Sequence, residues 1–461
     1  MNLKKIKSLA KKQENNNYQV KNVLKLKNKK EKYILKKKKS NEKIINKCNK
    51  KLLKEENDYR DIYLKIDKFN NNGKKTIVYF VDNFYPCVDG VLMVMENYVD
   101  YMSRFYNIVV CAPRHNKKDI SFDKYFVLFS DSIPIKGQGY DLGFPQFDSK
   151  FQKFISLLKI DLIHVHAPFN MGTFGLNLAK KRKIPCFATF HSQYKRDFYN
   201  AVKNKTIAIM LTKIILYVYQ NATLALTMND FSKNLMVEYG LTKKVEIIQN
   251  ATNMKPKEFD IKIENDILNR YNIRKELFNI IYIGRLVAVK NVYFILSVLK
   301  ELKKITSKFN FIFVGDGPEM LKMKQKCNDY GLTENITFAG KILDGDEKAV
   351  LIKNSKLLFF PSEYDTDGIV KMECACYEVP TLCLKNTGAS SNIIDNQNGF
   401  LEDNDILKCA KRIKFLIENV EIVNKVGKNA KIEIYKTWDD VCFQLKELYE
   451  KYFKKSFKNK R

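Results

Sequence analysis

Two acidic residues, Asp365 and Glu373, stand on either side of a glycine in the stretch LFFPSEYDTDGIVKMECA. An apolar run typical of a buried strand precedes Asp365, and a helix is expected to begin after Gly368. The amides of Gly368, Ile369 and Val370 would then lie at a helix N-terminus, where they can bind a phosphate. Glu373 could accept hydrogen bonds from ribose hydroxyls, and Asp365 from the hydroxyls of an attached sugar. On these residues alone, a Glu373 that only complements the helix dipole is an equally good interpretation.

A pair of cations follows another expected strand. Arg285 and Lys290 come directly after the apolar run FNIIYI, beside Gly284. A guanidinium and an ammonium in one loop can bind two oxygens of a diphosphate. The alternative for this weak signal is an unrelated pair of surface cations.

The elements that would position these residues alternate along the chain from residue 76 onward. Short apolar strands separated by helical segments are typical of parallel βαβ units. The sequence therefore predicts an α/β protein of two doubly wound domains, whose ligands bind at the carboxyl ends of the strands and in the cleft between the domains. The expected strands are Thr76–Asp82, Asn107–Pro113, Asp161–Pro168, Pro185–His191 and Ala222–Met228, then Phe278–Arg285, Phe309–Gly317, Ile336–Gly340, Lys356–Ser362 and Val379–Leu384.

The charge of the chain is strongly positive and unevenly distributed. The formal net charge is +31 over 461 residues, and residues 1–75 hold 25 Lys and Arg against 8 Asp and Glu. We expect residues 1–75 to be a solvated basic extension and the partners to be anionic, such as a lipid surface or a phosphorylated substrate. Nucleic acid is a weaker interpretation because the aromatic residues of this extension that could stack on bases, such as Tyr18, Tyr33 and Tyr59, are scattered.

The ten cysteines form no paired motif typical of zinc or of a disulfide framework, which favours a reducing cytosol. The N-terminus lacks the apolar core of a signal peptide. The most apolar window, Thr206–Leu226, is interrupted by Lys213 and predicts no membrane span. We therefore expect a cytoplasmic protein.

The chain resembles the retaining glycosyltransferases of family 4, which have the GT-B fold. The resemblance rests on GRLVAVKN, FVGDGPE, ITFAGKI and FFPSEYDTDGIVKMECACYEVP in this order, after NFYPCVDGV, DLIHVHAPFNMG and IPCFATFHSQY in the first half. It covers residues 76–453. Within the family, the chain looks most similar to bacterial enzymes that glucosylate diacylglycerol or related lipids.

The resemblance implies roles for the charged residues of the second half. Asp365 would lie near the donor sugar and Glu373 would bind the ribose, while Arg285 and Lys290 would bind the diphosphate. The expected reaction retains the anomeric configuration and needs neither a metal ion nor another cofactor. Asp365 is shorter than the Glu that is usual at this position of the family.

Further implications concern the first half and the domain limits. Gly90 would let the backbone approach the donor closely, and His191 would contact the donor sugar near the reacting centre. The expected domains are residues 76–256 on the acceptor side and residues 257–436 on the donor side. A last helix at residues 437–453 would cross back onto the first domain.

These features favour a transferase that moves a hexose, with glucose from UDP-glucose as the expected donor, to a lipid hydroxyl at the membrane surface. A polysaccharide-building transferase with a soluble glycan acceptor is the alternative. A non-catalytic relative that binds nucleotide-sugar or lipid is another. The alternating His164 and His166 could suit a metal, but no third ligand is evident, and packing roles are favoured.

A basic and apolar segment, Tyr194–Tyr219, is the expected contact with an anionic membrane. Lys195, Arg196, Lys203 and Lys205 open it, and Ile, Leu and Tyr follow. Such a combination is typical of an interfacial helix. For the apolar part from residue 207 onward, burial in the domain core is favoured over exposure. The enzyme would accordingly be peripheral to the membrane.

Overall fold

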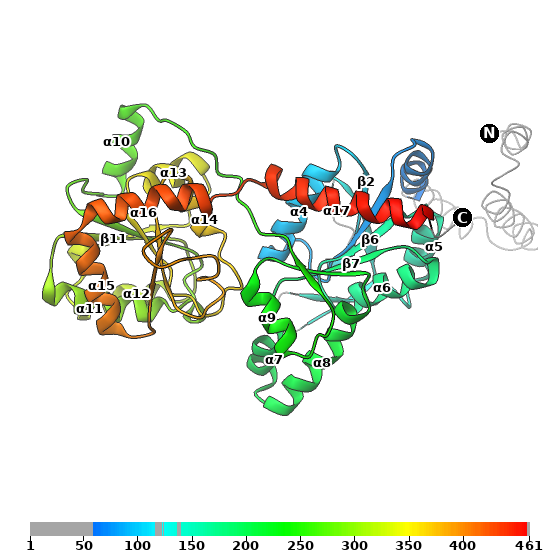
Figure 1. Ribbon diagram of the computed structural model, residues 1–461, viewed down its shortest axis with the longest axis horizontal. Coiled ribbons are helices and arrows are strands. Elements are labelled where there is room, and N and C mark those ends of the chain that lie inside the picture. Colours follow the sequence, from blue (N-terminus) through cyan, green and yellow to red (C-terminus); the bar gives the residue numbers. More distant parts are fainter. Residues whose placement is uncertain (1–58, 116–121, 123, 136–139, 459–461) are drawn as a thin grey trace, which may run out of the picture.

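A computed structural model describes residues 59–115, 122, 124–135 and 140–458 of the chain. The described residues form two α/β domains that lie side by side along the long axis of the molecule (Figure 1). Each domain is built around a parallel sheet, which confirms the predicted fold class. The predicted character of residues 1–58 lies outside the described part.

The sheet of the first domain has seven strands in the order β3-β2-β1-β6-β7-β8-β9. All of its neighbouring strands are parallel, as expected of strands joined by helical crossovers. A short antiparallel pair, β4 and β5, stands apart from it. The strands are β1 Thr76–Phe80, β2 Asn107–Pro113, β3 Phe126–Ser130, β4 Ser132–Pro134, β5 Asp141–Gly143, β6 Leu162–Val165, β7 Cys186–Phe190, β8 Leu224–Thr227 and β9 Val245–Ile247.

Helices cover both faces of this sheet because successive residues of each strand point to opposite sides. Val78 and Phe80 of β1 pack in the core that α5, α6 and α8 cover. Ile77 and Tyr79 pack in the core that α4 and α17 cover. The helices are α4 Gly90–Met102, α5 Ser149–Leu157, α6 Asn170–Arg182, α7 Tyr194–Val202, α8 Lys205–Asn221 and α9 Asp230–Glu238.

The second domain has six parallel strands in the order β12-β11-β10-β13-β14-β15 around one large apolar core. The strands are β10 Phe278–Ile283, β11 Phe309–Val314, β12 Ile336–Gly340, β13 Leu357–Phe359, β14 Thr381–Leu384 and β15 Phe400–Glu402. The helices are α10 Ile261–Arg270, α11 Val292–Ile305, α12 Met320–Asp329, α13 Gly345–Lys353, α14 Val370–Cys376, α15 Ile406–Glu418 and α16 Val420–Glu433, with short 3₁₀ turns η2 Ala288–Lys290 and η3 Thr333–Asn335.

The chain crosses twice between the domains, and the two crossings lie against each other. Thr252 and Thr437 form an isolated parallel bridge, and the Thr252 amide donates to the Lys436 carbonyl at 3.0 Å. The Tyr435 hydroxyl donates to the Met254 carbonyl at 3.0 Å. After the second crossing, α17 Trp438–Lys458 returns to the first domain beside α4 (Figure 1), as predicted for the last helix.

The packed part of the chain begins before the predicted limit at residue 75. Residues 59–71 are helical, and Ile66 is buried in the core of the first domain. The rings of Tyr59 and Tyr63 lie 5.5 and 5.4 Å from that of Phe154 on α5. The lysines of this helix remain on its solvent side, so the local charge bias concealed an amphipathic helix.

Asp82, directly after β1, caps the N-terminus of α6, which lies about 90 residues later in the sequence. Its carboxylate accepts hydrogen bonds from the amides of Phe169 at 3.0 Å, Met171 at 2.8 Å and Gly172 at 3.4 Å. Burial raises the pKa of Asp82 to about 7, although these three amides act in the opposite direction.

Three histidines at the ends of β6 and β7 are buried together. His164 contacts the Tyr449 hydroxyl of α17 through Nδ1 at 2.6 Å and the Thr189 hydroxyl through Nε2 at 2.7 Å. Nδ1 of His166 lies 3.4 Å from Nε2 of His191. Burial lowers the pKa of His164 to about 3, that of His191 to about 4, and that of His166 well below its usual value. The packing of His164 against α17 agrees with the structural role expected for it.

These burials predict a loss of stability in mild acid. Below pH 6.5 the unfolded chain takes up three histidine protons, whereas the folded chain does not. The free energy of unfolding should therefore decrease as the pH is lowered. Each proton contributes about 1.4 kcal/mol per pH unit. Asp82 acts against them by about one proton, because the folded chain keeps its proton up to a higher pH than the unfolded chain. The net slope near pH 5 should be about 2 to 3 kcal/mol per pH unit.

Urea unfolding between about pH 7 and pH 5 measures this slope. His166→Asn should reduce it by about one proton equivalent. A free energy of unfolding that stays constant over this range would contradict the burial of the three neutral imidazoles.

Candidate functional site

Asp365 lies in the loop after β13 and forms an ion pair with Lys290, at the end of η2. Only 19% and 14% of the two side chains are exposed, so solvent screens the pair weakly. The second carboxylate oxygen of Asp365 is buried without a hydrogen-bond partner among the described residues. The structure thus brings the predicted acid and the predicted diphosphate ligand together, 75 residues apart in the sequence.

Glu373 forms a second carboxylate–lysine pair. Its Oε1 accepts from Nζ of Lys348 on α13 at 2.8 Å, and both side chains are largely buried. Glu373 lies in the first turn of α14, as predicted. Lys348 carried no local signal in the sequence, because nothing near it indicates that α13 would pack beside α14.

The turn before α14 needs glycine for two reasons. Gly368 has a φ of +93°, a conformation that side chains rarely adopt, and an added Cβ would lie 2.8 Å from the Phe360 ring. The first backbone hydrogen bond of the turn runs from Lys371 to Gly368. The amides of Gly368, Ile369 and Val370 therefore precede the helical hydrogen bonds, as expected.

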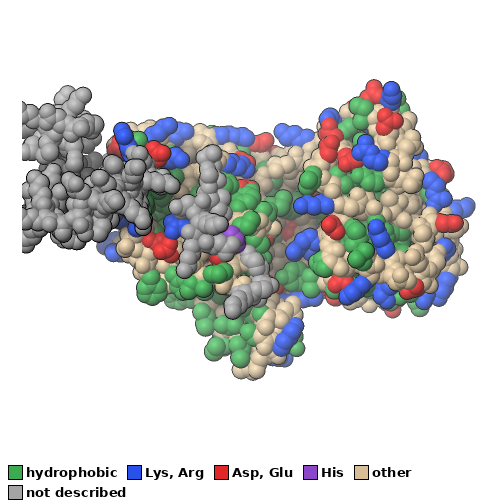
Figure 2. Space-filling model, turned by 180° about the vertical axis from the view of Figure 1, so that it is seen from behind, with side chains coloured by type: hydrophobic (Ala, Val, Ile, Leu, Met, Phe, Trp, Pro, Cys, Tyr) green, Lys and Arg blue, Asp and Glu red, His purple; other side chains and the backbone are tan. Residues whose placement is uncertain are grey.

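Arg285 follows β10 and is exposed. Burial raises the pKa of Tyr282 and Tyr364, and the charge of Arg285 partly opposes this shift at both. Burial also raises the pKa of Tyr140 in the first domain, to about 12, and the charge of Arg285 partly opposes this shift too. The guanidinium therefore lies where the two domains meet. In Figure 2 the surface is hollowed at this junction, and Lys and Arg side chains border the hollow on the side of the second domain.

His191 enters the junction from the other side. It follows β7 directly, and its backbone carbonyl accepts from the Thr366 hydroxyl at 2.8 Å. Because burial lowers its pKa to about 4, its imidazole is neutral at pH 7 and can donate or accept a hydrogen bond. Gly90 opens α4 on the same domain, and nothing lies within 4 Å of the position that a Cβ would take.

The loop at residues 363–367 is bound by the first domain at many points. Asn229 donates to the Thr366 carbonyl at 2.8 Å, and Asn250 donates to Asp367 at 2.9 Å. The remaining contacts come from Gln193, Arg196 and Asp197. Arg196 was predicted to contact a membrane instead, and none of these residues was predicted to contact the loop, because they lie more than 100 residues from it and have no common motif.

Asp367 and Lys371 form a buried ion pair at 2.7 Å, with exposures of 3% and 1%. Lys371 also donates to the carbonyl of Ser391 at 2.9 Å. An added Cβ on Gly388 would lie 2.2 Å from the Asp365 carbonyl. Asp367 therefore has a structural ion-pair partner, and the close approach of residue 388 fixes the backbone at Asp365.

The four basic residues predicted to meet a membrane differ in their surroundings. Lys195 pairs with Glu238 at 2.7 Å, and Arg196 donates to the Glu363 carbonyl at 2.8 Å. Lys203 and Lys205 are exposed at the junction of α7 and α8. The last two are thus accessible to a surface, whereas Arg196 is engaged with the second domain.

The expectation of burial for the apolar part of α8 holds for one face only. Ala208, Ile215 and Tyr219 are buried, but another face exposes a row of apolar side chains at helical spacing. This apolar row consists of Ile207, Met210, Ile214 and Tyr217, which are 42%, 54%, 59% and 47% exposed. Figure 2 shows hydrophobic side chains on the projection that α7 and α8 form.

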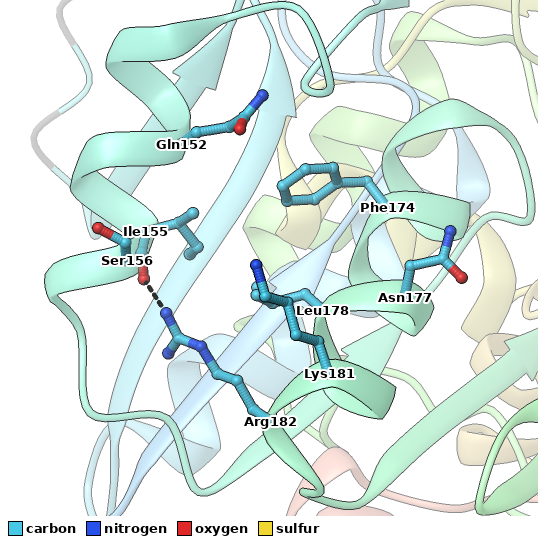
Figure 3. Close-up of a pocket in the computed structure, with 8 residues that line it drawn as sticks. All are labelled: Gln152, Ile155, Ser156, Phe174, Asn177, Leu178, Lys181 and Arg182. Carbon is cyan, nitrogen blue, oxygen red and sulfur yellow. Dashed lines mark hydrogen bonds between the residues drawn. The ribbon is translucent and has the colours of Figure 1, made fainter.

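A pocket of about 440 Å³ lies elsewhere on the first domain, between α5 and α6 (Figure 3). Phe174, Leu178 and Ile155 form its apolar wall, and Arg182 donates to the Ile155 carbonyl at 2.8 Å. It contains none of the predicted site residues. Among the described residues, no helix is long and apolar enough to span a bilayer. The same part of the chain holds no group of three His, Cys, Asp or Glu arranged for a metal ion.

Comparison with known proteins gives two family matches. Residues 88–255 match the family model described as Glycosyltransferase Family 4, and residues 264–433 match the model described as Glycosyl transferases group 1. The chain is 23% identical over 376 residues to the alpha-monoglucosyldiacylglycerol synthase of Acholeplasma laidlawii, covering 77% of this chain and 91% of that protein. It is 26% identical over 275 residues to the capsular polysaccharide biosynthesis glycosyltransferase CapH of Staphylococcus aureus, covering 57% and 69%.

The fold is also similar to that of HepE of Anabaena, solved in complex with UDP and glucose. The TM-score is 0.63 at 16% identity, and the match covers 82% of this chain and all of that one. The two family models together account for most of the chain and meet at the crossing between its domains. The chain therefore consists largely of two glycosyltransferase domains and is a glycosyltransferase of the GT-B fold.

Proposed function

We propose that the protein is a retaining, metal-independent hexosyltransferase that moves glucose from UDP-glucose to a lipid hydroxyl, such as that of diacylglycerol, at a membrane surface. The main support is the convergence of two carboxylate–lysine pairs and Arg285 at the carboxyl ends of the second sheet, opposite His191. The similarity to a monoglucosyldiacylglycerol synthase supports the choice of sugar and acceptor.

In this proposal the cations bind the diphosphate of the donor. Arg285 and Lys290 neutralise the charge that develops on the leaving UDP, which lowers the barrier to breaking the glycosidic bond. The free amides of Gly368, Ile369 and Val370 add hydrogen-bond donors for a phosphate. Glu373, already oriented by Lys348, accepts the ribose hydroxyls.

Asp365 and the first domain would act on the sugar. Asp365 has one buried carboxylate oxygen without a partner, which suits a hydroxyl of the transferred sugar. The neutral imidazole of His191 would contact the sugar near the reacting carbon, and Gly90 leaves room for the donor at the start of α4.

The acceptor side would bind the membrane through α7 and α8. The apolar row of α8 would enter the interface, and Lys203 and Lys205 would lie at the level of anionic headgroups. Each such cation contributes about 1 kcal/mol near an anionic surface. Lys195 would contribute less, because Glu238 already pairs with it.

A polysaccharide-building transferase with a soluble glycan acceptor is the second candidate, favoured by the similarity to CapH. Incubation with labelled UDP-glucose, UDP-galactose or GDP-mannose over mixed lipid vesicles, with and without soluble glycans, separates the two. Label in the lipid fraction supports the first candidate, and label only in the glycan fraction supports the second.

The donor-binding residues predict distinct effects on affinity and turnover. Glu373→Ala and Lys290→Ala should weaken UDP binding about 10- to 150-fold, because each removes a charge-assisted hydrogen bond worth about 1.5–3 kcal/mol. Asp365→Ala should lower turnover of UDP-glucose more than UDP affinity. Titration calorimetry and product assays measure both, with Lys414→Ala on the surface of α15 as the control. If the wild-type protein bound neither UDP nor GDP, the proposal would fail.

Metal independence predicts that a chelator leaves the reaction nearly unchanged. Arg285 and Lys290 supply the positive charge that a divalent cation supplies in other transferases, so glucose transfer with EDTA should stay within about twofold of that without it. Loss of transfer with EDTA, restored by manganese or magnesium, would contradict this assignment.

Membrane binding should depend on both the charge and the apolar row. Sedimentation with vesicles should rise with the phosphatidylglycerol fraction and fall with salt. Lys203→Gln with Lys205→Gln should reduce it, and so should Met210→Asp with Ile214→Asp, while UDP affinity stays unchanged. Ile432→Asp, at a 73% exposed position of the second domain, is the matched control. Equal, salt-insensitive sedimentation on neutral and anionic vesicles would favour the soluble-acceptor candidate.

A further inference from the structure

Tyr364, next to the proposed sugar-binding acid, is held by groups from both domains. Its hydroxyl donates to the carboxylate of Asp197 on α7 at 2.5 Å. Its backbone carbonyl accepts from the side-chain amide of Gln193 at 2.8 Å. The guanidinium of Arg196 lies 5.6 Å from the centre of its ring, and the ammonium of Lys290 lies 6.0 Å from it. The ring therefore has a cation of each domain beside it.

The adjoining backbone is bound by the same segment of the first domain. The Glu363 carbonyl accepts from Arg196 at 2.8 Å and from Gln193 at 3.1 Å. Within the second domain, the Asp365 amide reaches the Ser362 hydroxyl only at 3.3 Å. Polar contacts from the first domain thus hold the backbone of residues 363 and 364, which directly precede Asp365.

The start of α7 is well suited to hold this loop, because the first domain fixes it firmly. Tyr194 is buried, with its ring 5.3 Å from Phe190 at the end of β7 and 5.8 Å from Phe169. Gln193 and Asp197 stand on either side of this anchor, within one helical turn. A rigid strand end therefore carries the groups that meet the loop.

We propose that Tyr364, bound by Gln193, Arg196 and Asp197, is a positioning residue that sets the direction of the Asp365 carboxylate for the donor sugar when the two domains are together. The inference rests on the proposed role of Asp365 at the sugar. Tyr364 itself need not touch the donor, because the next residue in the chain is Asp365 and Lys290 contacts both side chains.

The proposal predicts that UDP affinity and the rate of sugar transfer depend on different contacts. UDP is bound by Arg285, Lys290, Glu373 and the amides before α14, which all belong to the second domain and do not require the hydrogen bond of the Tyr364 hydroxyl. In this proposal the direction of the Asp365 carboxylate depends on the cross-domain contacts of residues 363 and 364, in addition to Lys290 and the close approach of Gly388 within the second domain. Loss of these contacts should therefore reduce the rate of sugar transfer and leave nucleotide affinity intact.

Four variants test the inference. Tyr364→Phe and Asp197→Ala each remove the hydrogen bond to the phenol. They should lower kcat for UDP-glucose about 10- to 150-fold, as expected for a hydrogen bond to a buried charge. Asp197→Asn keeps an oxygen acceptor and should restore kcat to within a few-fold of wild type. Tyr199→Phe, on the exposed side of α7, is the matched control.

The UDP dissociation constant, measured by calorimetry, should stay within about twofold in all four variants. Hydrogen exchange of residues 363–367 should be faster in Tyr364→Phe and Asp197→Ala than in wild type and in Tyr199→Phe. Wild-type kcat in Tyr364→Phe, or equal loss of kcat and of UDP affinity, would overturn the inference.

The exchange measurement keeps this test separate from that of the proposed function. If no protein, including wild type, turned over UDP-glucose, the proposed donor would be wrong, and hydrogen exchange would decide alone. Faster exchange in Tyr364→Phe and Asp197→Ala would support the positioning role. Unchanged exchange would overturn it.

Discussion

Two carboxylates of the loop at residues 363–367, those of Asp365 and Asp367, are largely buried at the junction of the two domains, and each requires a compensating group. Lys290 and Lys371 of the second domain supply the positive charges for Asp365 and Asp367. Asn250 of the first domain supplies a further donor to Asp367. Because an unpaired buried charge is strongly destabilising, this conformation of the loop requires both lysines, and the hydrogen bonds from the first domain stabilise it further.

Because the first domain binds this loop, the packing of its own strands and helices also affects the site in the second domain. The core under α17 contains Tyr449, which bonds His164 at the end of β6. His166 and His191 continue the same row of imidazoles to the junction. The strand ends that carry His191 and Gln193 are thus supported by a helix from the end of the chain.

The two surfaces of α7 and α8 have separate tasks in this arrangement. The start of α7 faces the second domain through Arg196 and Asp197. The apolar row of α8 faces solvent on a projection away from the second domain (Figure 1). The consecutive helices α7 and α8 therefore connect the proposed membrane surface to the loop that carries Asp365.

Sequence patterns predicted most strands of the two parallel sheets, the returning helix, and the positions of Arg285, Lys290, Asp365 and Glu373 after strands or at the start of a helix. These features are local: an apolar run, a turn glycine and a following charge lie within a few residues of one another. Sequence patterns did not predict the edge strands β3, β9 and β15 or the antiparallel pair β4 and β5; all of these except β3 have only three residues.

Only the tertiary structure decided which groups compensate these charges and which face of α8 is exposed. Lys348 meets Glu373, and Asp197 meets Tyr364, because separate crossovers bring them to the same edge. The apolar residues of α8 are similar on both faces, so no periodicity distinguished Ile214 from Ile215. Such pairings depend on how whole elements pack, and the sequence near a residue does not indicate which side chain of another element will meet it, whether that partner is 25 or 167 residues away.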